Sequence, residues 1–204
     1  MATPITHIVL SEKIREKFFP DKVKQDFLIG TSFADIRHLK VIKREETHYN
    51  NLKVSDLQLD NSFQAGLKFH SILDLAREKF MVEHKIYELC PKSDYIVTSI
   101  KLLEDKLFYN YISNWDEYIK YFDTILSDEI AYNIDKSKLL KWHNILQAYF
   151  QIQPNSQSIV KHILRLGYSQ EMANEVNANI AIIEKNEQVL AIINKLYQEF
   201  ENLL

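Results

Sequence analysis

The chain has 204 residues, of which 46 % are hydrophobic, and 25 basic and 28 acidic side chains give it a formal net charge of −3. Only three residues are glycine and four are proline, well below the roughly 12 % that the two types reach on average. This scarcity disfavours a β-sandwich or barrel, which needs many tight turns. The glycines are too far apart for a phosphate-binding loop, and neither half of the chain is basic enough to favour duplex nucleic acid as a partner.

The first part of the chain predicts helices separated by one irregular stretch. We expect a helix from Ser11 to Pro20, a second over 21–30 that stops at Gly30, irregular chain with short helical pieces over 31–61, and a long helix from Ser62 to Pro91. In the last of these, apolar residues recur with the spacing of a helix and do not alternate as in a strand.

The remainder of the chain also predicts helices only. We expect them over 93–112, 115–126, 136–150 and 158–166, and then in one long element that starts after Ser169 and continues to the C-terminus. The apolar stripe of that last helix is suited to bundle packing, and its length would permit a homodimer. The predicted fold is an all-α, single-domain bundle over 1–204, with metal-site helices in 1–91 and a helical remainder in 92–204.

Cysteine content and hydropathy bear on the compartment. Cys90 is the single cysteine, so no intramolecular disulfide can form, which suits a reducing environment. The first residues lack the basic and then apolar pattern of a secretory signal, and no stretch has the 18 uninterrupted apolar residues typical of a membrane span. We expect a cytoplasmic protein with no membrane span.

Histidines and acids are concentrated early in the chain. Five of the seven histidines fall within the first 84 residues. His70 and Asp74 are four apart, which places them on one face of the predicted helix, and Gly66 lies one turn earlier on that face. A residue without a side chain at that position would let another backbone, or a metal with its water, come close.

Four short elements in order resemble the zinc-dependent phospholipase C and single-strand nuclease superfamily. They are Thr6-His7-Ile8, the GTSFADI string over 30–36, His48, and Gly66-x-x-x-His70-x-x-x-Asp74. Ala34 stands where the family has proline before the aspartate. The resemblance covers residues 6–74, about a third of the chain.

The resemblance implies an all-helical domain with a buried metal cluster of one to three ions, zinc or another divalent transition metal. His48, His70 and Asp74 would hold one ion, and Asp74 would bridge to a second ion held with His7. Asp35, also a metal ligand, would act in catalysis by orienting the attacking water or accepting its proton.

Other side chains are open candidates for the same site. The guanidinium of Arg37, next to His38, would suit a substrate phosphate oxygen, although an ordinary surface ion pair is the alternative. His84 and Glu88 have a second ligand-like spacing, but on a continuous helix His84 would lie about 21 Å from His70. Glu104 or Asp105 in the next helix could supply a carboxylate instead.

The predicted function is hydrolysis of a small phosphoester by metal-activated water. One alternative is a non-catalytic helical interaction or structural protein with a decayed metal site. Another is that the order of the histidines is a coincidence in an ordinary bundle, which a structure with His7, His48 and His70 far apart would establish. No histidine is followed by aspartate, and there is no G-x-S-x-G elbow, so HD-type phosphohydrolases and serine hydrolases are disfavoured.

Overall fold

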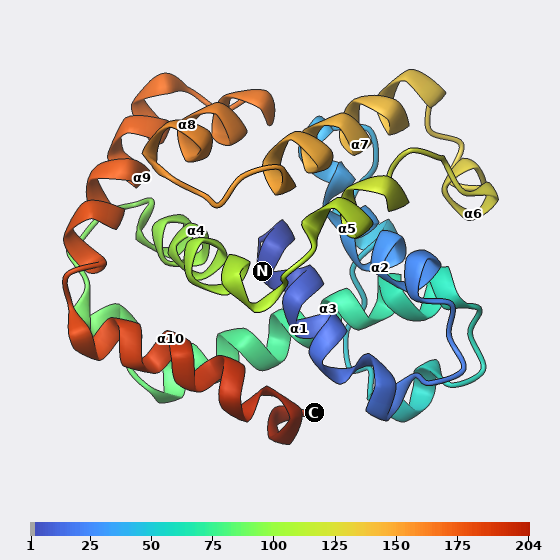
Figure 1. The fold of residues 1–204 in the computed structure, drawn as a ribbon, viewed down its shortest axis with the longest axis horizontal. Helices are drawn as coiled ribbons and strands as arrows, with labels where there is room; N and C mark the ends of the chain where they lie inside the picture. The colour runs from blue at the N-terminus through green and yellow to red at the C-terminus, as the bar shows by residue number, and fades with distance from the viewer. Residues whose placement is uncertain (1–2) are drawn as a thin grey trace.

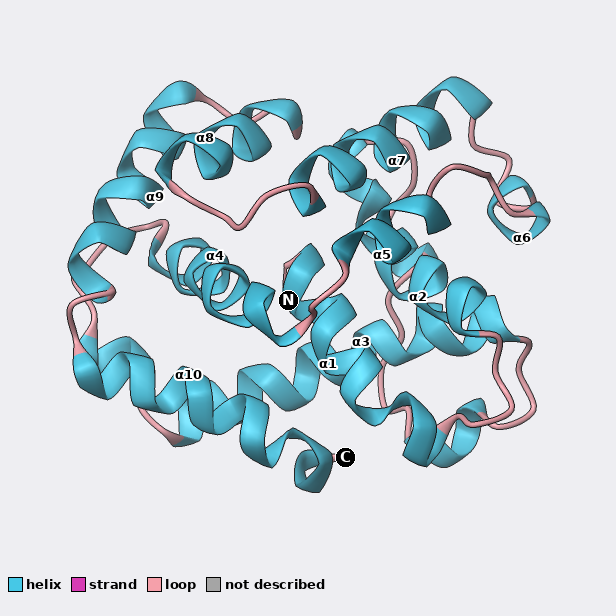
Figure 2. Cartoon of the chain, in the orientation of Figure 1, coloured by secondary structure: helices cyan, strands magenta, loops and turns pink. Residues whose placement is uncertain are grey.

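The computed structural model describes residues 3–204 as one all-helical domain (Figures 1 and 2). Of the chain, 73 % is helical, and residues 3–204 contain no strand, which confirms the predicted fold class. The α-helices are α1 (Pro4–Phe18), α2 (Lys24–Phe33), α3 (Ser62–Glu83), α4 (Ile96–Phe108), α5 (Trp115–Tyr121), α6 (Ser127–Ile130), α7 (Lys136–Phe150), α8 (Ser156–Arg165), α9 (Gln170–Ile183) and α10 (Glu187–Glu199). The 3₁₀ turns are η1 (Ala34–Leu39), η2 (Arg44–Glu46), η3 (Val54–Leu57), η4 (Ile86–Leu89), η5 (Tyr109–Tyr111) and η6 (Phe200–Leu203).

Helix α1 lies near the middle of the molecule, with α2 and α3 on one side and α4 on the other (Figure 1). It begins at Pro4, in the first turn, where proline costs no hydrogen bond. The prediction that this helix starts at Ser11 is therefore wrong, and Ser11 is buried inside it. Asp105 of α4 accepts hydrogen bonds from the backbone amide (2.7 Å) and the hydroxyl (2.8 Å) of Thr6. These bonds fix α1 against α4.

The closest contact between helices is the crossing of α2 and α3, which depends on two glycines. A Cβ atom on Gly30 would lie 2.1 Å from the carbonyl oxygen of Phe63, and one on Gly66 would lie 1.9 Å from the carbonyl oxygen of Phe27. Gly30 was expected to stop its helix, but α2 continues to Phe33. Gly30 allows the backbones of α2 and α3 to come into contact. The packing gained in this way outweighs the poor helix propensity of glycine.

Helix α3 is continuous from Ser62 to Glu83, shorter than the prediction. The side chain of Asn61 caps its start by accepting from the amide of Gln64. Its end coincides with a left-handed conformation at Lys85 (φ 53°), after which the chain continues as η4. Buried Arg77 (0 % exposed) joins α3 to α4 through a bidentate ion pair with buried Glu104.

The prediction of one long C-terminal helix is wrong. The chain forms α9 and α10, which meet at an angle (Figure 1). The break comes at Asn186, whose side chain accepts hydrogen bonds from the amides of Gln188 and Val189 and so caps α10. The apolar stripe is thus folded over two sides of the same core, where Val176 and Ile193 are buried.

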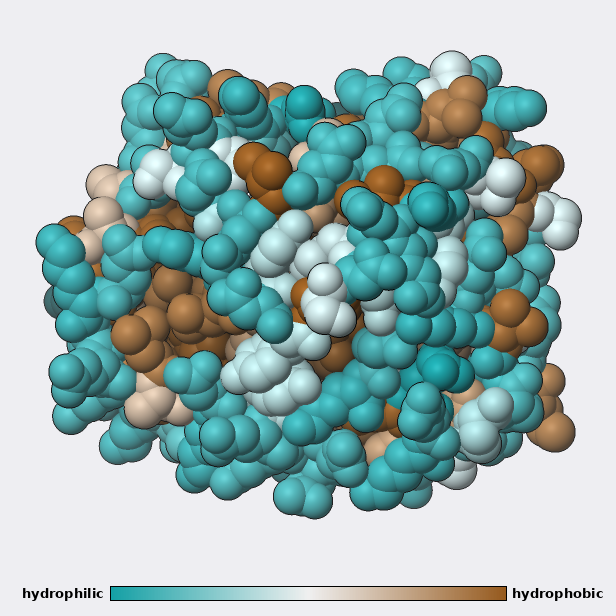
Figure 3. Space-filling model, in the orientation of Figure 1, coloured by the Kyte–Doolittle hydropathy of each residue, from teal (hydrophilic) through white to brown (hydrophobic). Residues whose placement is uncertain are grey.

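The surface of residues 3–204 is mostly polar on the face drawn in Figure 3, where apolar side chains gather in the area bounded by α4, α9 and α10. Within this part of the chain, no helix combines the length and the apolar character that crossing a bilayer requires.

The glycine contact gives a test of the fold. Gly66→Ala should lower the free energy of unfolding by about 3 kcal/mol, because the new methyl group would clash with the main-chain carbonyl of Phe27, which cannot move without shifting its helix. Gly167→Ala is the matched control. Gly167 has open space around it but a φ of +88°, so alanine there should cost only about 1 kcal/mol. Urea denaturation measures both, and equal losses would contradict a tight crossing.

Candidate metal centre

Five predicted ligands converge in one buried cluster, although they come from four segments. His7 lies in the first turn of α1, Asp35 in η1, His48 just after η2, and His70 and Asp74 one turn apart on α3. All five side chains are buried. His7, His48 and His70 therefore lie together, and the distant placement that would have established a coincidental order is not observed.

Asp74 is the centre of the cluster. Its Oδ1 lies 3.3 Å from Nε2 of His7, and its Oδ2 lies 3.4 Å from Nε2 of His70 and 4.0 Å from Nε2 of His48. Asp35 approaches from the other side, with Oδ1 3.9 Å from Nε2 of His70. Two overlapping sets of ligand atoms, each within 4.8 Å, result: His7, His70 and Asp74, and Asp35, His48 and His70.

Hydrogen bonds to the far side of two rings set their orientation. Nδ1 of His70 lies 2.8 Å from the carbonyl oxygen of Thr31, which can only accept, so Nδ1 carries the hydrogen. Nδ1 of His48 lies 3.0 Å from Oγ1 of Thr47, and this hydroxyl donates to the carbonyl oxygen of Ala34 at 3.0 Å. Both Nε2 atoms therefore face the carboxylates, in the arrangement usual for metal-ligating histidines.

The three Nε2 atoms of His7, His48 and His70 are buried and lack a hydrogen bond of acceptable geometry within residues 3–204. Buried polar atoms without partners are rare and costly. The rings of His7 and His70 stack with centroids 3.9 Å apart, so their nitrogens are held close together. A divalent cation would satisfy these nitrogens and the carboxylates at once, and imidazole with carboxylate is a donor set that zinc accepts. The residues present thus fit a metal ion.

The charges of the cluster are strongly coupled. Burial alone lowers the pKa of His70, but Asp74 and Asp35 outweigh it, and the pKa of His70 is raised. Burial and the neighbouring His70 lower the pKa of His7, and they lower that of His48 to about 3. Burial would raise the pKa of both carboxyl groups, yet the histidines hold it well below the usual range. The two carboxylates are therefore ionised at neutral pH and need positive charge beside them.

Three further side chains surround Asp35 at the edge of the cluster. Nη2 of Arg37 lies 3.3 Å from its Oδ1, and Nε2 of His38 lies 3.5 Å from the same oxygen. Nδ1 of His38 lies 2.9 Å from the hydroxyl of Tyr168. Tyr168, between α8 and α9, has no motif around it that could have indicated this position from the sequence.

A cavity of about 500 Å³ reaches the cluster from outside, with His48 and Asp74 in its wall. Arg44, Asn50 and Asn51 also line it. These three residues lie in the stretch 31–61 that was predicted to be irregular. The sequence there has no apolar periodicity from which a cavity wall could be predicted. A small molecule in this cavity would contact the ligands of the candidate metal directly.

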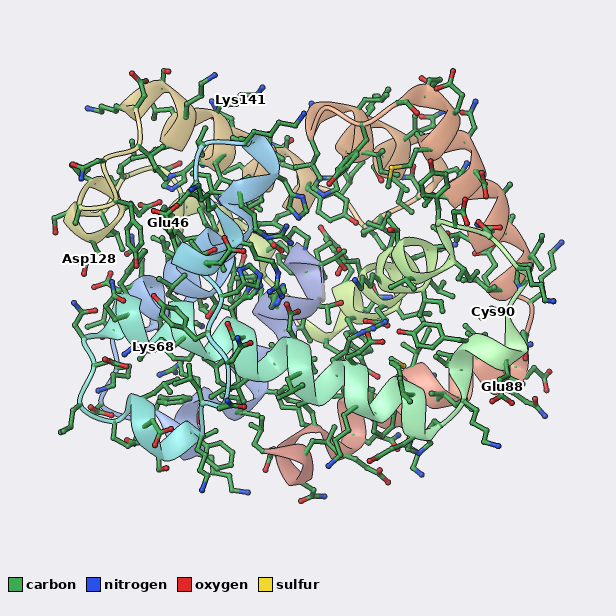
Figure 4. The ribbon with its side chains drawn as sticks, turned by 180° about the vertical axis from the view of Figure 1, so that it is seen from behind. Glu46, Lys68, Glu88, Cys90, Asp128 and Lys141 are labelled. Atoms are coloured by element: carbon green, nitrogen blue, oxygen red, sulfur yellow. The ribbon has the colours of Figure 1, made fainter. Side chains whose placement is uncertain are left out.

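The other candidate ligands lie elsewhere. His84 is at the C-terminal end of α3, where its Nδ1 lies 2.9 Å from the carbonyl oxygen of Phe80. Glu88 lies beyond that end of α3, near Cys90 (Figure 4). Glu104 pairs with Arg77, and Asp105 binds Thr6. None of the four belongs to the cluster, and the two buried acids fix helices instead.

Comparison of the chain with models of known protein families gives no match, and neither the curated proteins nor the solved structures give a significant one.

Asp105 gives a pH-dependent test of how α1 is held. Burial raises its pKa to about 7, in spite of the hydrogen bonds from Thr6. The folded protein therefore binds more protons than the unfolded chain between about pH 4 and 7, and Asp105 makes the protein less stable as the pH rises through that range. Asp105→Asn keeps an acceptor for Thr6 and removes the charge.

This variant should match the wild type near pH 4.5 and exceed it at pH 8, by up to about 4 kcal/mol in free energy of unfolding. Urea denaturation at the two pH values measures the difference. The same stability difference at both pH values would show that the carboxyl group does not titrate in this way.

Proposed function

We propose that the protein is a metal-dependent hydrolase of a small phosphoester, with zinc or another divalent transition metal at the cluster. The observation that carries the proposal is the set of three buried imidazole nitrogens that lack a hydrogen bond of good geometry and face two ionised carboxylates beside a cavity. The order of the motifs over residues 6–74 supports the same reading. The proposal includes a cytoplasmic location, in keeping with the single cysteine.

The roles follow from position. His7, His48, His70 and Asp74 would hold the metal, and a divalent ion held in this way activates water for attack on phosphorus and stabilises the charge that develops. Asp35 also has an oxygen within reach of the metal ligands. Because it stays ionised, it can orient the attacking water and accept its proton. Arg37, beside Asp35, has the planar guanidinium that matches phosphate oxygens.

The substrate class follows from the cavity. A volume of about 500 Å³ suits a small molecule. Arg44 in its wall adds a positive charge that favours an anion. A non-catalytic protein with a decayed site is the alternative function. A decayed site would have no need of the hydrogen bonds that His70 and His48 donate to Thr31 and Thr47, which turn both imidazoles toward the carboxylates.

Metal content is the direct test. The purified wild type should contain at least one equivalent of zinc or a similar metal, and His70→Ala/Asp74→Ala should contain almost none, because each proposed metal set loses a shared ligand. The control is His84→Ala, which removes a histidine outside the cluster and should leave the metal content unchanged. Elemental analysis by mass spectrometry provides the measurement.

Added zinc should also raise the melting temperature of metal-depleted wild type by several degrees, because a ligand that binds only the folded state stabilises it. The double variant should show no such rise. A wild type that neither contains nor takes up a transition metal at micromolar supply would overturn the proposal.

Arg37 gives a kinetic test. Arg37→Ala should reduce kcat/KM for a chromogenic phosphodiester by about 10–100-fold, the effect of losing one charge-assisted bond to phosphate. Metal content should stay that of the wild type. The control is Arg15→Ala, eight residues along α1 from His7 and paired with Glu12, which should leave kcat/KM unchanged. Equal activity in both variants would remove Arg37 from the substrate site.

A further inference from the structure

A second cavity, of about 210 Å³, lies between the C-terminal half of α7 and helix α8. Its lining includes two basic side chains, Lys161 and Arg165, and the amide side chains of Asn155 and Gln157. No aspartate or glutamate lines it. The cavity is therefore rich in hydrogen-bond donors and has positive charge without a balancing carboxylate.

Lys161 and Arg165 are one turn apart on α8, which brings two like charges together on one helix face. Within residues 3–204, neither forms an ion pair. Other basic side chains between helices do form ion pairs, as Lys24 does with Glu12 and Lys106 with Glu184. The pair on α8 is thus an unneutralised positive site at the mouth of a cavity.

Buried His162 forms part of the wall. It is only 4 % exposed, and its ring stacks on Tyr149 with centroids 3.9 Å apart. Its Nδ1 is buried and has no hydrogen-bond partner within the described part of the chain. Burial, His38 and Arg165 lower the pKa of His162 to about 3. A neutral imidazole carries a hydrogen on one ring nitrogen, so His162 can donate one hydrogen bond to a ligand from the wall of the cavity.

We propose that this cavity is a second anion site, which binds a compact anion of the phosphate type separately from the metal centre. Lys161 and Arg165 supply the charge, with the guanidinium fork suited to two oxygens of the anion. The amide of Gln157 adds a neutral donor. The tetrahedral anion presents several acceptor oxygens at once, as a cavity lined by donors from several directions requires.

The site borders the proposed active site. His162 also lines a smaller cavity, of about 190 Å³, whose wall includes His38 and Tyr168. These two side chains bond to each other, and His38 reaches Asp35. The second site does not depend on the proposed hydrolase activity, because its groups belong to α8 and lie outside the metal set.

Titration of the full chain with inorganic phosphate, followed by the NMR signals of the histidine rings, tests the proposal. In the wild type, the ring signals of His162 should shift in a saturable way. In Lys161→Ala/Arg165→Ala, the affinity reported by His162 should fall at least tenfold, because two charge-assisted contacts are lost. Both residues are exposed, so the fold should tolerate the change.

The control is Lys136→Ala/Lys138→Ala, which removes the same charge from exposed positions of α7 that do not line the cavity. Its affinity should stay within twofold of the wild type. Phosphate that shifts only the rings of His48 or His70 binds at the metal centre and would overturn the second site. So would an absence of saturable binding, or equal loss of affinity in both double variants.

Discussion

The contact of α2 with α3 is the constraint on which the site depends. With side chains at Gly30 and Gly66, each helix would collide with the other's carbonyl groups. Because the backbones touch, the carbonyl oxygen of Thr31 reaches Nδ1 of His70. That bond fixes which nitrogen of the imidazole faces the carboxylates. The packing of two glycines thus determines which nitrogen of His70 faces the site, since a wider crossing would separate the ring from the carbonyl oxygen that orients it.

The cluster beside this crossing holds several buried charges that need compensation. Asp35 and Asp74 are buried beside three histidines, and ionised groups are costly to remove from water unless they are paired. Part of the compensation is internal, because the pKa of His70 is raised between the two acids. The same proton would have to leave for Nε2 of His70 to bind a cation. A metal ion and a proton therefore compete for Nε2 of His70. With either one bound, the two carboxylates have a positive charge beside them.

Much of the site could be predicted from local spacing, but its supports could not. His70 and Asp74 follow from a four-residue separation on a helix, and the order of motifs associated Asp35 and His48 with them. Tyr168 comes close to the site only because α8 and α9 turn back toward η1. This tertiary arrangement cannot be predicted from the residues around Tyr168. The helices themselves followed from apolar periodicity, whereas their ends depended on tertiary contacts. Gly30 did not end α2, and the break before α10 depends on a single asparagine cap within an uninterrupted stripe.

The distribution of buried acids separates structural from chemical roles. Glu104 is bound on both oxygens by Arg77, and Asp105 receives both the amide and the hydroxyl of Thr6. Each of these acids has donors from the protein and joins two helices. Asp74 instead faces Nε2 of His7 at 3.3 Å and Nε2 of His70 at 3.4 Å, and imidazole with carboxylate is a donor set that a divalent cation accepts. Burial alone would not distinguish the two kinds of acid. The type of partner does, because Glu104 and Asp105 face ordinary donors, whereas Asp74 faces imidazoles that could join it in holding a metal ion where α1 and α3 meet.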